Sequence, residues 1–248
     1  MKSPLRKRLP RELKSEFGKY LVVFIMMAIT IGFVSGFLVA DGSMLRAYDD
    51  SFQKYNIEDG YFQTKKKLTP AQKEDIEKSD VKVYENFYIE QKLTNGSTIR
   101  FFKNRKEVDK VCLMNGKMPK KSGEIAVDRM YADNNELKVG DTVKSRKKTF
   151  RITGLVALSD YSALFQNNND TMFDAVKFGV AIVTDKDFET LNQVKVQYNY
   201  AWIYDKKPAT EKKEKKMAED LMEDMVDVVT IESFVPQYQN QSIHFTGD

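Results

Sequence analysis

One uninterrupted apolar stretch constrains this chain more than any other feature. Residues 21–40 read LVVFIMMAITIGFVSGFLVA and contain no charged side chain. A helix rises about 1.5 Å per residue, so a stretch of this length spans roughly 30 Å, which is the thickness of the hydrocarbon core of a bilayer. The sequence therefore predicts a transmembrane helix over residues 20–40.

The charges on either side of this stretch predict its orientation. Residues 1–19 contain seven Lys and Arg against two Glu, a net charge of +5, and acidic residues prevail just after the stretch. Lys and Arg collect on the cytoplasmic side of a membrane. We therefore expect a cytoplasmic N-terminus and an extracytoplasmic main domain. The whole chain carries only +4, so the remainder is nearly neutral and no nucleic-acid surface is predicted.

A cleaved secretory signal is the alternative interpretation of this stretch. The apolar core of a signal peptide is usually about 7–15 residues long and ends at small residues spaced A-x-A. Here the core is longer, and Leu38 does not fit that pattern before Ala40. A retained anchor is favoured.

In the leader, Leu5, Leu9, Leu13 and Phe17 recur every four residues, which fits an amphipathic helix on the inner headgroups or a solvated basic flank.

Small residues form a stripe along the predicted span. Ala28, Gly32, Gly36 and Ala40 recur every four residues, and Gly32 and Gly36 form a G-x-x-x-G pattern. Such a stripe lets a second helix approach closely, although Gly is frequent in membrane helices generally. The pattern favours a span that packs against other helices.

The rest of the chain predicts an α+β fold in an extracytoplasmic domain. Apolar residues at helical spacing predict a helical stalk over residues 41–56, and the domain is expected over residues 57–236. Beyond residue 57 the apolar period switches repeatedly between about two and about 3.6, which is typical of α+β domains. Two lobes would place a boundary in the polar connection at residues 161–177. Residues 237–248 are expected to return toward a second span.

Local patterns predict individual elements of this domain. Asn95-Gly96 predicts a hairpin with a type I′ turn, and Asp185 is expected to cap a helix. Strands are expected at Tyr61–Lys65, Val81–Ile89, Ile99–Lys103, Gly123–Val127, Thr142–Ser145, Thr149–Val156, Phe178–Thr184 and Tyr198–Tyr204, with helices at Pro70–Lys78, Arg129–Glu136 and within residues 211–225.

Sequence signals for chemistry are lacking. There is no G-x-x-x-x-G-K-[ST] motif for ATP hydrolysis. The chain has one Cys, Cys112, and one His, His244, so neither a disulfide within the chain nor a zinc cluster of these residues can form. A lone extracytoplasmic thiol is consistent with a bacterial surface. We predict no catalytic, cofactor-binding or metal-ligating residue, and a membrane-tethered hydrolase using His244 is disfavoured.

A motif in the middle of the chain carries a family resemblance. Its residues are Gly116, Lys117, Pro119, Gly123, Glu124, Ile125, Val127 and Asp128, then Lys138, Val139, Gly140, Asp141 and Val143, then Phe150, Ile152, Gly154 and Leu155. With the basic leader and single span before it, this arrangement resembles the N-terminal part of FtsX/MacB-like ABC transporter permeases. The motif residues themselves suit turns and close backbone approach, so we interpret them as structural.

The resemblance implies a non-catalytic permease subunit. It implies further transmembrane helices, a separate cytoplasmic ATPase subunit that binds ATP, and a second permease copy or homologous permease as partner. The outer substrate or partner protein is left unspecified. A single-span receptor or sensor ectodomain that acts without an ATPase is the alternative.

Overall fold

The computed structural model describes residues 14–145, 148–191 and 195–243, and the chain divides into two compact units between Asp50 and Ser51. The helix α2 (Phe17–Tyr55) covers both the predicted span and the predicted stalk. Within the described residues, its segment Phe17–Ala40 is the one stretch long and apolar enough to cross a membrane. All side chains from Leu21 to Ala40 are exposed in the isolated chain. Because exposed apolar surface costs about 25 cal/mol per Å², this helix requires lipid or other helices around it.

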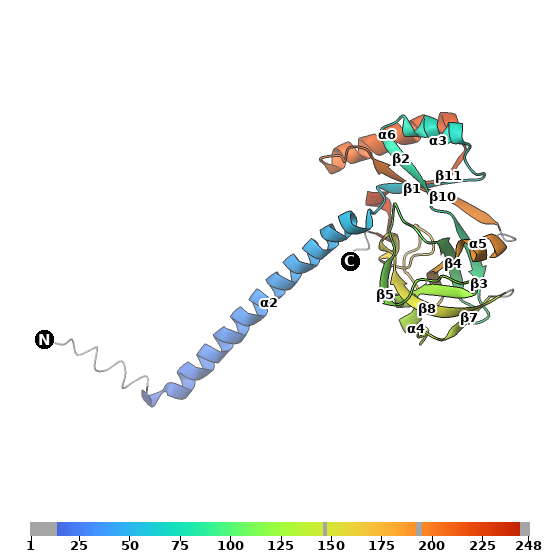
Figure 1. Cartoon of the computed structure of the whole chain (residues 1–248). Helices are drawn as coiled ribbons and strands as arrows, with labels where there is room; N and C mark the ends of the chain where they lie inside the picture. The colour runs from blue at the N-terminus through green and yellow to red at the C-terminus, as the bar shows by residue number, and fades with distance from the viewer. Residues whose placement is uncertain (1–13, 146–147, 192–194, 244–248) are drawn as a thin grey trace. The chain divides into compact units, whose positions relative to one another are not determined.

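The second unit is built on one mixed sheet, as the α+β prediction requires (Figure 1). The strand order is β11-β1-β10-β3-β4-β9-β6-β8-β5, while β2 pairs with β10 and β7 pairs with β8. The strands are β1 (Gly60–Thr64), β2 (Val81–Glu85), β3 (Tyr88–Lys92), β4 (Thr98–Lys103), β5 (Cys112–Gly116), β6 (Glu124–Asp128), β7 (Thr142–Lys144), β8 (Thr149–Ala157), β9 (Phe178–Val183), β10 (Val196–Tyr204) and β11 (Ile231–Pro236). The pairs β4–β9 and β6–β8 are parallel, and the other pairs are antiparallel.

Two separate cores divide this unit into two lobes. We call lobe A the part around β1, β2, β11 and the C-terminal half of β10, where Phe62 and Tyr200 stack with ring centroids 5.2 Å apart. Trp202 stacks on Phe234 at 4.7 Å in the same core. Lobe B contains β3 to β9, and its core includes Phe101 and Phe150 together with every residue of the buried strand β9 except Gly179.

The lobes are joined by β10 and by a bend between β2 and β3. Residues 200–204 of β10 pair with β2, whereas Val196 and Gln197 pair with β3. The predicted strand Val81–Ile89 is therefore two strands, separated by Asn86 and Phe87. The predicted lobe boundary at residues 161–177 is wrong, because Leu164 and Ala175 belong to the core of lobe B. The boundary between the lobes lies along β10, at the point where its pairing changes from β3 to β2, and not in a polar connection.

The helices begin where side chains satisfy free backbone N–H groups. In α3 (Pro70–Glu77), Thr69 and Gln72 form a reciprocal capping box. In α6 (Glu211–Val228), the apolar stripe of Ala218, Leu221 and Met225 is buried, so this charged run is a packed helix. The folded unit also contains α4 (Arg129–Asn134), α5 (Asp185–Leu191) and the short 3₁₀ turns η1 (Ser159–Tyr161) and η2 (Gln237–Gln239).

Two local predictions need correction. The β3–β4 hairpin forms, but only Gly96, with φ +89°, adopts a positive φ in its loop, whereas a type I′ turn requires one at Asn95 as well. The Asn95 side chain instead accepts hydrogen bonds from the backbone N–H and hydroxyl of Ser97. At α5, Asp185 is the first helical residue, and the cap is Thr184, whose hydroxyl accepts a hydrogen bond from the backbone N–H of Asp187 at 3.2 Å.

Two strands have no counterpart in the predictions. Strand β5 is mostly exposed, so it lacks the apolar alternation of a half-buried strand. Strand β11 pairs with β1 across a register shift near Gln63 and Thr64, and its sequence IESFVP ends in a proline. After β11, Ile243 is buried, and residues 237–243 pack on the same unit. The leader positions up to Leu13 and His244 lie outside the described residues.

Candidate functional site at the junction of the two lobes

The chain enters the folded unit alongside a loop of lobe B. The backbone carbonyl of Tyr55 accepts a hydrogen bond from the N–H of Lys110 at 2.8 Å, and that of Asn56 accepts one from Asp109 at 3.0 Å. The Asn56 side chain donates to the carbonyl of Glu107 at 2.7 Å. Both Asn56 and Asp109 have a positive φ, which Asn and Asp tolerate better than most residues. These contacts bind the end of α2 and the residue after it to residues 107–110.

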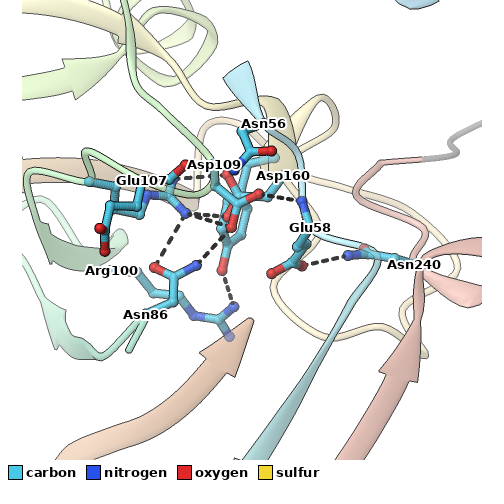
Figure 2. Close-up of polar contacts among 10 residues, drawn as sticks. Asn56, Glu58, Asn86, Arg100, Glu107, Asp109, Asp160 and Asn240 are labelled. Atoms are coloured by element: carbon cyan, nitrogen blue, oxygen red, sulfur yellow. Dashed lines mark hydrogen bonds and ion pairs between the residues drawn. The ribbon is translucent and has the colours of Figure 1, made fainter. Parts of the chain in front are cut away.

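Four charged side chains meet just beyond this entry, and we call them the junction cluster; its three acids are labelled in Figure 2. They are Glu58, Arg105, Asp109 and Asp160. Arg105 binds Asp160 with both terminal nitrogens and lies 3.8 Å from Asp109. The backbone N–H of Glu58 donates to Asp109 at 2.9 Å. Arg105 and Asp109 come from the loop between β4 and β5, Asp160 from η1 and Glu58 from the segment before β1. All four side chains are almost entirely buried.

Asn86 connects this cluster to the bend between the lobes. Its side-chain N–H group donates to Asp109 at 3.3 Å, and its side-chain oxygen accepts a hydrogen bond from Arg105 at 3.3 Å. Its backbone N–H donates to the carbonyl of Asn199 in β10 at 2.9 Å. Asn86 therefore ties the bend and β10 to the charges of lobe B.

The C-terminal segment reaches the same place. The side chain of Gln237 donates to the carbonyl of Glu58 at 2.8 Å. Figure 2 shows the side chain of Asn240 beside the Glu58 carboxyl group, at a distance of 3.5 Å. The carbonyl of Ser242 accepts a hydrogen bond from the N–H of Ala163 at 3.1 Å. The segments that precede β1 and follow β11 therefore meet at the junction cluster.

Burial and mutual repulsion perturb the acids of the cluster. Burial raises the pKa of Glu58 well above its ordinary value, and the charges of Asp109 and Asp160 raise it further. Burial, followed by the charge of Asp160, raises the pKa of Asp109 to about 7. For Arg105, burial alone would lower the pKa, but Asp160 outweighs it and raises the pKa above the usual value, so Arg105 stays charged.

Two hollows adjoin the cluster. A polar cavity of about 30 Å³, room for about one water molecule, is lined by residues that include Glu58, Asn86 and Asn199. A larger groove of about 840 Å³ lies between the lobes, and Asn86 also lines it. Its walls include Phe87 and carry both basic and acidic side chains, among them Lys103 and Glu189. The volume is in the range of ligand-binding clefts.

The predicted motif residues lie apart from this cluster, around β5, β6 and β8. Gly116 pairs with Gly154 in the β5–β8 ladder, where an added Cβ at either position would come within 2.6 Å of a backbone carbonyl oxygen. Gly116, Gly123 and Gly140 all have positive φ. Their geometry is that of a scaffold with turns and one close strand approach.

The polar residues of the motif hold its loops. The Glu124 carboxylate accepts hydrogen bonds from the backbone N–H groups of Lys120 and Lys121, which follow Pro119, and these bonds lower its pKa. Asp141 accepts one from the N–H of Lys138 at 2.8 Å. On α2, an added Cβ at Gly32 or Gly36 meets no described atom within 4 Å, so this part of the stripe of Ala28, Gly32, Gly36 and Ala40 is open to a neighbour.

The junction cluster was not predicted from sequence. Its members lie 51 residues apart between Glu58 and Asp109, and 55 apart between Arg105 and Asp160. Asp109 has a positive φ and follows the buried residue Val108, but no pattern of residues in the sequence indicates either feature. Within the described residues, no group of three His, Cys, Asp or Glu side chains could hold a metal ion. The arrangement is suited to holding segments together and to binding protons.

No known family profile and no curated protein matches the chain. Among solved structures, the chain is similar to the extracellular domain of the noncanonic ABC-type transporter YknZ from Gram-positive bacteria, with TM-score 0.37 and 12% identity over 71% of this chain and 97% of that one. It is also similar to the periplasmic region of MacB from Actinobacillus actinomycetemcomitans, with TM-score 0.39 and 14% identity over 76% and 93%. Both similarities are distant, so we argue function from the chain's own residues.

Proposed function

We propose that this chain is the first membrane span and the extracytoplasmic domain of an ABC transporter permease subunit. Its N-terminus lies in the cytoplasm, and ATP is bound and hydrolysed by a separate cytoplasmic ATPase subunit. The chain itself is not an enzyme and carries no cofactor. It couples motion driven by that ATPase to an outer substrate or partner, and its membrane span packs against the rest of the permease or a second copy.

The observation that carries this proposal is where α2 ends. The helix that contains the apolar span ends at Tyr55, and Glu58 and Asp59 follow within one turn's length. Asp59 is hydrogen-bonded to β10 of lobe A, through its N–H to the carbonyl of Trp202 and through its carboxylate to the N–H of Tyr204. Glu58 is hydrogen-bonded to Asp109 of lobe B. A displacement of this short segment would therefore act on both lobes at once.

Isolation of the protein from its native membranes tests the assignment. A tagged chain should co-purify in mild detergent with a protein that contains a P-loop, and the complex should hydrolyse ATP. Replacing the P-loop lysine of that partner should abolish the hydrolysis while the complex stays assembled. A chain that purifies without any P-loop protein, and that dimerises through its own span, would support the receptor alternative instead.

Labelling in intact cells tests the orientation. In a Cys112→Ser background, a cysteine at Met172, whose side chain is 82% exposed, should react with a membrane-impermeant maleimide. A cysteine in place of Lys7 should react only after the membrane is permeabilised. The reverse pattern would contradict the proposed topology.

A further inference from the structure

The junction cluster contains more buried acids than it can neutralise. Glu58, Asp109 and Asp160 face one guanidinium, that of Arg105, and Asp160 occupies both of its terminal nitrogens. Side-chain exposure is 6% for Arg105, 0% for Asp109 and 5% for Asp160. A buried ionised carboxylate without a partner costs several kcal/mol. Neutralising these acids therefore requires at least one bound proton.

The hydrogen bonds identify which acid is left over. Asp160 has its bidentate bond with Arg105, and Asp109 accepts hydrogen bonds from the N–H of Glu58 and from Asn86. Glu58 has one donor, Asn240, at 3.5 Å, which is a weak contact. Its other oxygen, Oε2, is buried and has no hydrogen-bond partner among the described residues. Glu58 is thus the acid whose ionised form is least stabilised.

The polar cavity supplies a second, independent observation. Glu58 and Asn199 both line it, and the side-chain oxygen of Asn199 is also buried with no partner among the described residues. The cavity is thus lined by two hydrogen-bond acceptors, the Oε2 atom of Glu58 and the side-chain oxygen of Asn199, and neither has a donor among the described residues. A protonated Glu58 supplies that donor, either to the Asn199 oxygen or to a water between them. An ionised Glu58 would add only another acceptor.

We propose that Glu58 is a proton-binding site that is occupied at neutral pH, and that its ionisation loosens the junction between the segment after α2 and the C-terminal segment. The charged groups that face it are Asp109, Asp160 and Arg105. Arg100, across the cavity, is bound to Glu90 and Tyr161. Burial raises the pKa of Tyr61 and of Tyr161, so neither phenol ionises in this range. The proposal concerns the chain alone and does not depend on the permease assignment.

The sign of the pH dependence follows from the raised pKa of Glu58. A carboxyl group whose pKa is raised in the folded state holds its proton more tightly than in the unfolded state. Its contribution to stability is therefore fully present below about pH 4.5 and is lost as the pH rises through the folded-state pKa. A difference of one pH unit between the folded-state and unfolded-state pKa values changes the unfolding equilibrium constant about tenfold.

Urea unfolding of the full chain in detergent, followed by the fluorescence of Trp202, tests this dependence. Trp202 is the sole tryptophan and is fully buried. Between about pH 5 and pH 8, the unfolding constant of the wild type should rise by well over tenfold, because burial also raises the pKa of Asp109 to about 7 and that of Asp128 to about 6. Glu58→Gln should remove about tenfold of that rise or more. Glu189→Gln, whose side chain is 70% exposed, is the matched control and should retain it. A Glu58→Gln variant with the wild-type pH dependence would overturn the proposal.

Infrared spectroscopy of the wild type keeps the proposal testable even if Glu58→Gln fails to fold. At about pH 7.5 the spectrum should contain the C=O stretch of a protonated carboxyl group, and this band should vanish at higher pH. The band should also appear in an Asp128→Asn background, which excludes Asp128 as its source. Absence of the band would overturn the proposal.

Discussion

Arg105 and Asp160 form a two-point ion pair in which the Nη1–Oδ2 distance is 2.6 Å and the Nη2–Oδ1 distance is 2.8 Å. The pair joins the loop after β4 to η1 at the end of β8, and Asn86 attaches to it from the bend between the lobes. Because Arg105 is 6% exposed, it cannot exchange this partner for water. The segment after α2 is connected to this buried pair through Asp109, which accepts a hydrogen bond from the N–H of Glu58 and lies 3.8 Å from Arg105.

Removal of Asp160 should destabilise the domain strongly. Asp160→Ala removes both charged hydrogen bonds of the buried Arg105 and leaves Asp109, 3.8 Å away, as its counter-charge, so we expect a loss of about 2–3 kcal/mol in the free energy of unfolding. The matched control is Asp133→Ala, which breaks the exposed Arg129–Asp133 pair and should cost less than about 1 kcal/mol. Urea unfolding followed by Trp202 fluorescence measures both. Equal losses in the two variants would show that the ion pair does not anchor the junction.

Gly116 and Gly123 should respond differently to alanine. Both have a positive φ, but a Cβ at Gly116 would lie 2.3 Å from the carbonyl oxygen of Thr153, whereas one at Gly123 meets no described atom within 4 Å. Gly123→Ala should cost about 1 kcal/mol of backbone strain. Gly116→Ala adds a clash between β5 and β8 and should cost about 3 kcal/mol or more. Thermal unfolding of the two variants provides the comparison, and similar losses would contradict the close approach.

Asp187 should be the residue that holds the motif loop against α5. Its buried carboxylate accepts hydrogen bonds from the Ser122 hydroxyl at 2.6 Å and the Gly123 N–H at 2.8 Å, and it pairs with Lys148. Asp187→Ala should cost about 2–3 kcal/mol, because charged hydrogen bonds are lost and buried donors are left unpaired. Asp185→Ala, in the same helical turn but exposed, should cost less than about 1 kcal/mol.

Hydrogen exchange distinguishes the loss of these local contacts of Asp187 from a general loss of stability. In Asp187→Ala, exchange of the backbone N–H groups around Gly123 should accelerate more than exchange in β9. Burial alone would raise the pKa of Asp187, but the bonds from Lys148 and Ser122 hold it below its ordinary value. Its contribution is thus present above about pH 4 and lost as the pH falls further. Uniform acceleration of exchange across the domain would contradict a local role of Asp187 in holding this loop.

Asp128 should give the opposite pH dependence. Burial raises its pKa to about 6, even though its carboxylate accepts hydrogen bonds from the N–H groups of Met130 and Tyr131 at the start of α4. Stability from this group is present below about pH 4 and is lost as the pH rises through about 6. Asp128→Asn retains a capping oxygen and should flatten the stability profile between these values. An unchanged profile would show that Asp128 ionises freely.

The stripe on α2 should mediate packing of the membrane span. Gly36→Leu places a large side chain at the point where a second helix would approach, so association of spans in micelles should weaken by roughly 1 kcal/mol or more. Phe37→Leu, one position off the stripe, is the control and should change association little. Energy transfer between labelled chains measures the effect. Equal association of both variants would indicate that the stripe faces lipid.

Elements with strong local signals could be predicted from sequence. Thr69 and Pro70 mark the start of α3 because capping and a fixed proline φ act within one turn. The apolar stripe of α6 and the continuous apolar strand β9 are likewise visible along the chain. Strand β5 could not be predicted, because exposed residues such as Leu113 acquire strand structure only when the segment pairs with β8.

The candidate site could not be predicted at all, for a related reason. Residue patterns report which face of an element is apolar, and the members of the junction cluster lie in turns without such a face. Glu58 reads as an ordinary charged residue until Asp109, Asp160 and Asn240 are brought around it. Only burial changes its chemistry, and burial is a property of the folded unit.

The sequence by itself determined the apolar helix, the mixed α+β character and the local starts of helices, because each depends on side chains within a few residues of one another. Tertiary structure alone decided the two lobes, since β10 pairs with β1, β2 and β3 from distant parts of the chain. It also decided the pairing of Arg105 with Asp160 and the isolation of Glu58. Removing carboxyl groups from water creates their unusual proton affinity, and that requires the whole unit to close around them.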